Sequence, residues 1–362
     1  PTACTWSCDT NGICGSSMPA RRRFDVTENP NAAELRTPKP AWHQAISRYA
    51  RPNQRKAIWQ LVNTFVPYIG IWALMIYTVK SGMPYWITFA LAIPASLFMV
   101  RIFIFFHDAG HGSFLASAKA NTVVGYITGV LTFTPYHSWR RAHARHHATA
   151  GNLDRRGTGD VWTMTVEEYR TAPRRTRIAY RVYRNPVVLF GLGPAASFLF
   201  AQRFPQKGAK RRERNSVWIT NLAILAIVVL ASLTIGFGTY AMIQLPITLV
   251  GGALGIWLFY VQHQYQGVYW ARDDTWDATR AALEGSSYYK LPKLLQWLTG
   301  NIGLHHIHHL RPRIPNYSLQ KCYDELPAMQ EVQPLSIRAS LASLRMNLWD
   351  EERQVLVSFR SL

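Results

Sequence analysis

Four long apolar runs separate the polar segments of this 362-residue chain. The runs cover about residues 57–79, 83–106, 216–238 and 239–261. Each run is close to the ~20 residues that a helix needs to cross the hydrocarbon core of a bilayer. The pattern therefore predicts four transmembrane helices.

Two shorter apolar stretches, about 121–136 and 186–200, contain glycine and fall below spanning length. Such segments are typical of re-entrant or interfacial helices, and buried helices packed against the spans are the alternative. The predicted fold is therefore an all-α integral membrane protein with four spans, two short helices that do not cross and a helical cap. We expect an N-terminal tail at 1–54, a membrane domain at 55–330 and a C-terminal helical segment at 331–362.

The cap is predicted to contain helices near residues 318–330 and 335–350. In the second of these, apolar residues recur at roughly helical spacing, which favours one face packed against the rest of the cap. They are Leu335, Ile337, Leu341, Leu344 and Leu348.

Charge is distributed unevenly around the spans. The chain has 40 Lys and Arg against 20 Asp and Glu, a net charge of +20. The basic residues concentrate before residue 57 and within 139–215, whereas the turns between paired spans carry only Lys80. The positive-inside rule then predicts that both termini and the middle segment are cytoplasmic. Contact with anionic membrane lipid explains the basic runs, so no nucleic-acid partner is expected.

The cysteines give no metal or disulfide pattern. Cys4, Cys8 and Cys14 lie near the start in no zinc-binding spacing, and Cys322 stands alone. Met18 is followed by Pro-Ala-Arg-Arg-Arg, which resembles a natural start, so we expect residues 1–17 to be non-native. Nothing in this N-terminal stretch has the layout of a cleaved secretory signal, so we expect an unprocessed protein inserted in the membrane.

Nine of the 12 histidines fall in three short windows. The windows are His107-Asp-Ala-Gly-His111, His143-Ala-Arg-His146-His147 and His305-His306-Ile-His308-His309. Residues three and four apart lie on one face of a helix, so each window offers chelating imidazoles. So many ligands indicate two metal ions, but imidazole suits zinc, copper, iron and nickel alike. His306 points about 100° away from His305 on a helix and is left out.

The predicted topology brings the three windows to one face of the membrane. Two crossings end just at His107, the non-crossing 121–136 stretch keeps the chain on that side, and two more crossings return it before His305. His263 ends the fourth span at the same depth and is predicted to be a further ligand. His137 is left outside the ligand set, and His43 is expected at the surface.

These motifs, in this order and with an isolated histidine before the third, resemble those of the membrane fatty-acid desaturase superfamily over about residues 55–330. The phrases around His107, residues 151–162 and residues 300–312 are most similar to bacterial relatives of the omega-6 (delta-12) acyl-lipid group. The resemblance implies an O2-dependent oxidoreductase that removes two hydrogens from adjacent methylenes of a fatty acyl chain, which is expected to be lipid-linked. Hydroxylases or ketolases of alkanes, sterols or carotenoids share the motifs, and a non-enzymatic membrane metal-binding protein is a more distant alternative.

The resemblance also implies two iron ions, a separate electron donor of the ferredoxin or cytochrome b5 type, and a place in the bacterial inner membrane. Carried over residue by residue, the ligands are His107, His111, His143, His146, His147, His263, His305, His308 and His309. In animal acyl-CoA desaturases an Asn one turn before the isolated histidine contacts the site through water. Phe259 occupies that position here.

Three other polar residues are candidates for supporting the ligands: Asp108, Asp154 and Asn301. Asp108 could orient an imidazole or contact a basic neighbour, and Asn301 could face the metals or serve as a cap. Asp154 and Asp160 share a glycine-rich loop, where ligand support and plain loop structure are both open. Seven aromatic residues near the motifs could line an acyl tunnel, although an interfacial girdle is the commoner explanation. They are Phe103, Phe105, Phe106, Phe114, Trp139, Tyr265 and Trp270.

Overall fold

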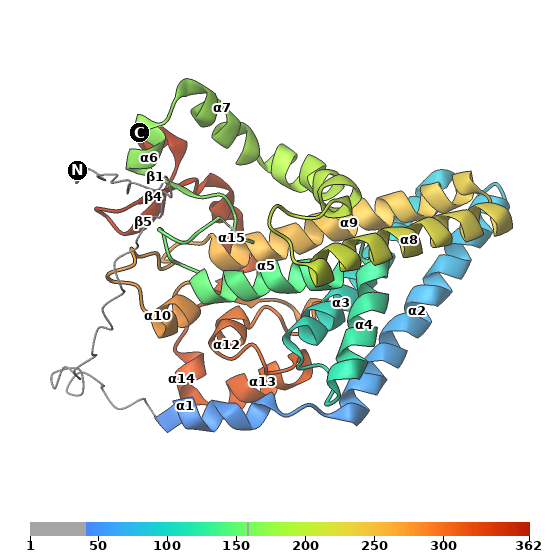
Figure 1. The fold of residues 1–362 in the computed structure, drawn as a ribbon, viewed down its shortest axis with the longest axis horizontal. Helices are drawn as coiled ribbons and strands as arrows, with labels where there is room; N and C mark the ends of the chain where they lie inside the picture. The colour runs from blue at the N-terminus through green and yellow to red at the C-terminus, as the bar shows by residue number, and fades with distance from the viewer. Residues whose placement is uncertain (1–40, 158) are drawn as a thin grey trace, which may run out of the picture. The chain divides into compact units, whose positions relative to one another are not determined.

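The computed structural model describes residues 41–157 and 159–362. Within them, four helices are long and apolar enough to cross a membrane, which confirms the predicted spans (Figure 1). These are α2 (Gln54–Lys80), α3 (Tyr85–His111), α8 (Arg211–Thr234) and α9 (Phe237–His263). Residues 1–17 and their three cysteines lie outside the described residues, so their non-native origin stays a prediction.

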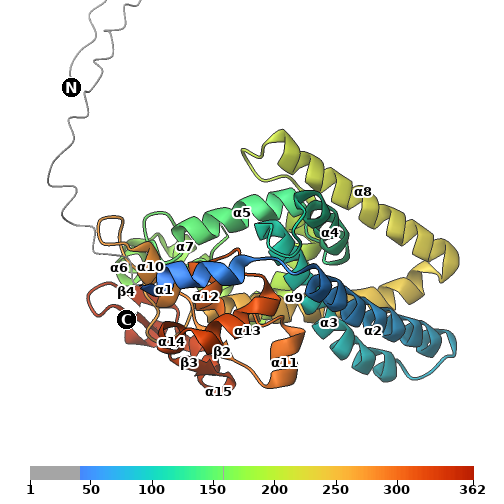
Figure 2. The ribbon, with the colours of Figure 1, turned by 90° about the horizontal axis from the view of Figure 1, so that it is seen from below.

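The four long helices form two hairpins, α2 with α3 and α8 with α9 (Figure 2). The inner helices are α3 and α9, whose apolar windows are 56% and 44% buried, against 22% and 11% for α2 and α8. Met99 of α3 packs with Ile243 and Ile247 of α9. Gly251 of α9 lies close to α3, since a Cβ atom there would meet the Met99 methyl group and lie 3.4 Å from the Ser96 carbonyl oxygen. The pairing places the C-terminal ends of α3 and α9 side by side.

Two further apolar segments are short or bent. Helix α4 (Ala118–Leu131) has 14 residues, or about 21 Å, which is less than the ~30 Å hydrocarbon core. The second segment consists of the π-helical turns η3 (Val187–Leu192) and η4 (Ala195–Phe200), followed by η5 (Ala201–Arg203). With α7 (Arg174–Tyr183) it makes a pair bent by 64°, which by length and composition could also count as one broken span.

The contacts of α8 show on which side of the fold the η3–η5 segment ends. The backbone N–H of Ser138, in α5 (Tyr136–Thr149), donates to Ser216 Oγ of α8. Arg141 of α5 forms an ion pair of 2.5 Å with Glu213 of α8. The N-terminal end of α8 therefore lies on the same side of the fold as α5.

The remaining elements are short and surround the ends of α3, α5 and α9. They are α1 (Ala41–Ala45), η2 (Ile46–Ala50), β1 (Met164–Thr165), α6 (Val166–Thr171), α10 (Ala278–Leu283), β2 (Tyr288–Lys290), α11 (Lys293–Leu298), α12 (His305–Leu310), α13 (Asn316–Glu325), α14 (Pro327–Gln330), β3 (Pro334–Ser336), α15 (Ile337–Ser340), η6 (Leu341–Arg345), β4 (Leu348–Asp350), β5 (Val355–Val357) and η7 (Phe359–Ser361). In the described residues the strands form one three-stranded sheet, β1-β4-β5, and one two-stranded sheet, β2-β3. The fold is mostly helical, as predicted.

The prediction of one helix over 335–350 is wrong. This stretch begins in β3, passes through the single turns α15 and η6, and ends in β4. Leu348 and Trp349 are almost fully buried and pair with both β1 and β5. Apolar residues three to seven apart fit short strands and turns as well as a helix, and pairing with distant strands decided the outcome.

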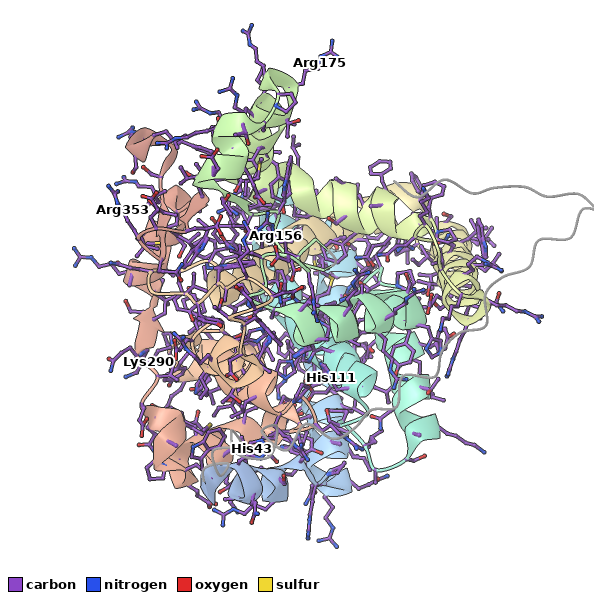
Figure 3. The ribbon with its side chains drawn as sticks, turned by 60° about the vertical axis from the view of Figure 1, so that its left-hand side comes forward. His43, His111, Arg156, Arg175, Lys290 and Arg353 are labelled. Carbon is purple, nitrogen blue, oxygen red and sulfur yellow. The ribbon has the colours of Figure 1, made fainter. Side chains whose placement is uncertain are left out.

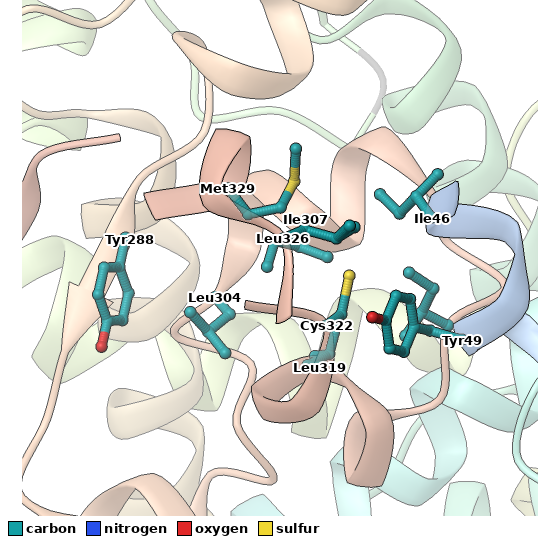
Figure 4. Packing of buried hydrophobic residues seen from close by; sticks show 10 residues of the cluster. Ile46, Tyr49, Tyr288, Leu304, Ile307, Leu319, Cys322, Leu326 and Met329 are labelled. Atoms are coloured by element: carbon teal, nitrogen blue, oxygen red, sulfur yellow. The ribbon is translucent and has the colours of Figure 1, made fainter. Parts of the chain in front are cut away.

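A compact apolar cluster includes Ile307 of α12, the helix that carries the third histidine motif (Figure 4). Ile307 of α12 is fully buried there with Leu304, Cys322 and Met329. Because Ile307 lies between His306 and His308, anchoring it determines which way the neighbouring imidazoles point. The predicted 318–330 helix is present as α13 and α14, which are separated at Leu326 before Pro327.

Candidate metal centre

The first histidine motif forms the last turns of α3. His107 and His111 lie four residues apart, so their imidazoles share one face, with ring centroids 4.7 Å apart. The helix ends at Gly112, which has a left-handed φ of 69° and closes the turn onto the carbonyl groups of Asp108 and Ala109. The inner membrane helix therefore delivers two imidazoles at its end.

The second and third motifs divide their histidines in the same way. On α5, His143 and His147 share one face, whereas His146 is turned toward another. On α12, His305 and His309 form the corresponding four-residue pair, and His308 is turned away from them. Each H-x-x-H-H motif can therefore supply two imidazoles to one ion and one imidazole to a second ion.

The structure gathers all nine predicted ligands into two groups. In each group the candidate ligand atoms lie within 4.8 Å of one another. Group one contains His107, His111, His143, His147 and His308, and group two contains His146, His263, His305 and His309. The α5 pair joins group one and the α12 pair joins group two, so the two motifs are used reciprocally. The stick view shows His111 next to the green ribbon of α5 (Figure 3).

The spacing of the nitrogen atoms fits ligands that share an ion. His147 Nε2 lies 3.1 Å from His143 Nε2 and 3.0 Å from His308 Nε2. In group two, His263 Nε2 lies 3.2 Å from His146 Nε2 and 3.0 Å from His305 Nε2. Two nitrogens at ~2.1 Å from one ion and at a right angle would be about 3.0 Å apart.

Buried nitrogen atoms without a hydrogen-bond partner also indicate that these histidines bind metal ions. Nε2 of His107, His111 and His309 is buried and has no partner among the described residues. A buried polar atom left unpaired is costly, and a metal ion would satisfy it. The donor set is all imidazole, which suits iron as well as zinc, copper and nickel.

Burial also favours the protonation state that metals require. It holds the pKa of the imidazoles on α5 and α12 well below the ordinary histidine value, and the neighbouring imidazoles lower it further. This applies to His143, His147, His305, His308 and His309. These side chains are therefore neutral near pH 7, with a lone pair free for coordination.

Asp108 lies behind the first motif and contacts both His107 and Asn316. Its Oδ1 atom is 3.1 Å from His107 Nδ1, and its Oδ2 atom accepts from the backbone N–H (2.7 Å) and the side-chain amide (2.9 Å) of Asn316. The side chain of Asn316 in turn accepts from Gln60 of α2 at 2.8 Å. This buried network orients the imidazole of His107 so that Nε2 faces group one. Sequence reasoning missed Asn316 and Gln60, because no motif distinguishes them.

The loop after the second motif places Asp160 next to His146 of group two. Its Oδ1 atom lies 2.5 Å from His146 Nδ1, and both side chains are almost fully buried. Gly159 has a left-handed φ of 78°, and a Cβ atom there would lie 3.1 Å from the Ala142 carbonyl oxygen. Glycine thus lets the loop approach α5 closely enough for Asp160 to reach His146.

Asp160→Asn is expected to lower the affinity of group two for metal by roughly 10–100-fold, since loss of a carboxylate behind a ligand imidazole has that effect. Asp154→Asn is the matched control from the same loop, because Asp154 contacts Arg272 and the backbone of Asp273 instead. The measurement is metal content after dialysis against graded chelator. Equal retention by the two variants would contradict the role assigned to Asp160.

Several other candidates lie away from both groups. Asn301 donates to the Asn316 carbonyl oxygen rather than facing the imidazoles. His306 points to the carbonyl of Met329, as its exclusion predicted, and burial lowers its pKa to about 4. His137 accepts from Arg212, and His43 is a half-buried residue of α1 that belongs to neither group.

An apolar cavity of about 390 Å³ opens between α3, α9 and the η4 segment, and its lining includes residues of both histidine groups. His107 and His143 of group one and His305 of group two border it. Along α3 it extends from His107 back to Met99, a depth of roughly 12 Å at 1.5 Å per residue. The space therefore joins the metal-binding groups to the membrane-embedded helices.

Two of the seven aromatic residues considered for a tunnel, Phe103 and Trp139, line this cavity. The Trp139 ring also stacks on the imidazole of His143 at 4.2 Å. The other five pack in apolar clusters: Phe105, Phe106 and Phe114 in one, Tyr265 and Trp270 in another.

Phe259 lines the cavity next to group two. Its ring centroid lies 5.1 Å from that of His146 and 5.0 Å from that of His263. This position therefore offers no polar atom to group two, which has one imidazole fewer than group one.

Arg184 is a second feature that the sequence did not indicate. It is 3% exposed, and its guanidinium donates to Tyr260 Oη and Gln264 Oε1, each at 3.1 Å, and to the Met346 carbonyl. Gln264 is adjacent to His263, and its amide donates to Thr163 at 3.1 Å. Arg184 thus ties the end of α7 to the end of α9, where a group-two ligand lies.

The family model and the similar proteins point to the same family. The sequence model of the fatty acid desaturase family matches residues 83–340. A fatty acid desaturase of Bacillus subtilis is 47% identical over 88% of this chain and 90% of its own length. An sn-1 oleoyl-lipid 12-desaturase of Synechocystis is 26% identical over 62% of this chain and 64% of its own. An sn-1 acyl-lipid omega-3 desaturase (ferredoxin) from the same organism is 27% identical over 62% of this chain and 63% of its own.

The matched region holds all nine clustered histidines together with the cavity that they border. The match covers well over half of the chain, and the first of these relatives is aligned over nearly its whole length. With four helices able to span a membrane, the chain belongs to the fatty acid desaturase family and is an oxidoreductase, a membrane fatty acid desaturase.

Proposed function

We propose that this protein introduces a double bond into the acyl chain of a membrane lipid, using O2 and two external electrons at a pair of iron ions. The observation that carries the proposal is the apolar cavity bordered by both histidine groups. An unactivated methylene offers no polar handle or leaving group, so its position relative to the metals must be set by shape. A cavity lined by α3 and α9 provides such positioning from within the membrane-spanning helices.

The nine imidazoles would hold the two irons, five in group one and four in group two. Bound iron would supply the oxidising chemistry with O2 that no protein side chain can supply. The protein's own groups orient the ligands: Asp108 acts on His107, Asp160 on His146, and the Gly285 carbonyl on His263 at 3.2 Å. Phe103, Trp139 and Phe259 keep the space beside the imidazoles apolar and exclude water from it.

The test is expression in a bacterium that lacks polyunsaturated lipid, followed by mass spectrometry of fatty acid methyl esters with localisation of double bonds. We expect a new double bond at one position in chains extracted from membrane lipid. Hydroxylated chains would instead assign the hydroxylase reaction, and unchanged chains in cells that contain the metal-loaded protein would contradict the proposal.

We further propose that a separate electron donor docks on the exposed face of α5. Arg141 and Arg145 lie about 160° around the helix from His143, and Arg140 lies about 60° from it; all three are exposed. Neither Arg140 nor Arg145 has a carboxylate within ion-pair distance among the described residues. Helix α5 therefore carries metal ligands together with two exposed arginines that have no carboxylate partner among the described residues, which suits an acidic redox protein such as a ferredoxin.

Arg140→Gln/Arg145→Gln is expected to raise the KM for ferredoxin by roughly fivefold or more at low ionic strength, and less at high salt. Reduction of the iron by dithionite should stay unchanged, because that small reductant needs no docking surface. Arg175→Gln/Lys290→Gln removes the same charge elsewhere and is the matched control (Figure 3). An unchanged KM for ferredoxin in the α5 variant would contradict the assignment.

In the membrane, we propose that the histidine groups and both termini lie on the cytoplasmic side of a bacterial inner membrane. Support comes from the hairpins α2–α3 and α8–α9, because each starts and ends on the side of the histidine groups. The basic residues of 139–215 lie on that side as well, in agreement with the positive-inside rule.

A further inference from the structure

A second cavity lies between α6 and α7, apart from the histidine groups, and it is bordered by cations. Its volume is about 490 Å³, and its lining includes Arg170, Arg174, Arg177 and Arg181. On α7 the last three recur at intervals of three and four residues, which places them on one face of the helix. Tyr169, Ile178 and the final residue, Leu362, complete the lining.

None of these four arginines is within ion-pair distance of a carboxylate among the described residues. Arg181 donates to Tyr169 Oη at 2.5 Å and lies 5.0 Å from the centre of the Phe359 ring, so its guanidinium is held in place. Four cations that line one hollow give it a positive potential, which attracts an anion. Phosphate is the anion that the planar guanidinium group binds best.

Exposed apolar residues next to this cavity indicate where the phosphate comes from. Ile178 and Val182 are each 52% exposed and lie four residues apart on α7, and Val187 in the following turn is 75% exposed. The apolar surface continues through Leu192 to Phe200, along the η3–η4 segment that packs against α9. A helix with arginines beside an exposed apolar stripe is typical of a membrane interface.

We propose that the α6–α7 cavity binds the phosphate group of an anionic membrane phospholipid, at a site separate from the acyl cavity. The arginines contact the headgroup while Ile178, Val182 and Val187 contact the start of the acyl region. A soluble acidic partner would match the charge but would leave this apolar stripe exposed to water. Continuity with the membrane-facing segment therefore favours a lipid.

Arg184 connects this site to the metal centre. It caps the C-terminal end of α7 and holds Gln264, the neighbour of the group-two ligand His263. A lipid bound along α7 would hold that helix, and with it Arg184, against the end of α9. The site therefore fits a lipid that stabilises the metal centre.

The experiment measures binding of phosphatidylglycerol to the detergent-purified, full-length protein by native mass spectrometry, with phosphatidylcholine as the neutral comparison. We expect Arg174→Gln/Arg177→Gln to weaken phosphatidylglycerol binding by about thirty-fold. The reason is that each arginine near a membrane phosphate adds to the binding free energy, and this variant loses two of them. Arg175→Gln/Lys290→Gln removes equal charge outside the cavity lining and should bind as the unmodified protein does. The melting temperature and metal content of each variant show whether it is folded.

Three outcomes would overturn the proposal. The first is equal phosphatidylglycerol binding by the two double variants. The second is loss of phosphatidylglycerol binding in the presence of millimolar inorganic phosphate, which would assign the site to a free anion. The third is an increased KM for ferredoxin with unchanged lipid binding in the α7 variant, which would assign the surface to a protein. The two lipid-binding readouts do not depend on desaturation, so a failure of the proposed reaction is recognised separately.

Discussion

His308→Ala is expected to remove roughly one metal ion per chain and to lower desaturation by more than about 100-fold, since even the residues behind a ligand typically contribute 10–100-fold. His308 is fully buried, and its Nε2 lies 3.0 Å from that of His147 in group one. The change leaves Ile307 in its apolar cluster, so α12 should remain folded. Iron content by mass spectrometry and product formation are the two measurements.

His306→Gln is the matched control from the same motif. The side chain of His306 lies 3.0 Å from the Met329 carbonyl oxygen, outside both histidine groups, and a glutamine amide can donate to that oxygen. This variant should keep its full iron content and most of its activity. If His306→Gln lost metal while His308→Ala kept it, the assignment of ligands on α12 would be wrong.

Gly255→Leu is expected to lower activity on long acyl chains by at least about tenfold while sparing shorter ones, because small differences in fit to an apolar pocket change rates by that order. Gly255 lines the acyl cavity, and a Cβ atom there would meet nothing within 4 Å, so leucine would extend into empty space. The position lies two turns before His263 on α9, roughly 12 Å along the helix. Product profiles from acyl chains of graded length give the measurement.

Gly70→Leu is the control for the general effect of placing a leucine in a spanning helix. Gly70 of α2 also has open space around its Cα atom, but it is exposed on the outer helix and does not line the cavity. Its chain-length profile should match that of the unmodified protein. An identical profile for Gly255→Leu would show that the acyl chain does not occupy this cavity.

Local spacing predicted much of the metal centre. Positions three and four apart on a helix must share a face, so the His143–His147 and His305–His309 pairs follow from the sequence. The reciprocal use of the two motifs, in which His308 joins the α5 pair, follows only from where the fold places α12. That placement depends on buried neighbours of Ile307 that are distant in the sequence, and no local pattern encodes it.

Other contacts at the site could not be predicted from short sequence patterns. Asp154 and Asp160 share one glycine-rich loop, and only the fold of that loop shows that Asp160 reaches His146. Arg184 and Asn316 make contacts with residues far away in the sequence, which no nearby motif indicates. The spans were predictable because bilayer thickness imposes a length, whereas residues 335–350 were not, because strand pairing is long-range.

The most direct test is anomalous diffraction at the iron edge from crystals of the purified, iron-loaded protein. Two peaks per chain are expected, one about 2.1 Å from imidazole nitrogens of group one and the other at the same distance from those of group two. A single peak, a peak bound by residues outside the nine histidines, or two sites that bind zinc but not iron would contradict the diiron centre.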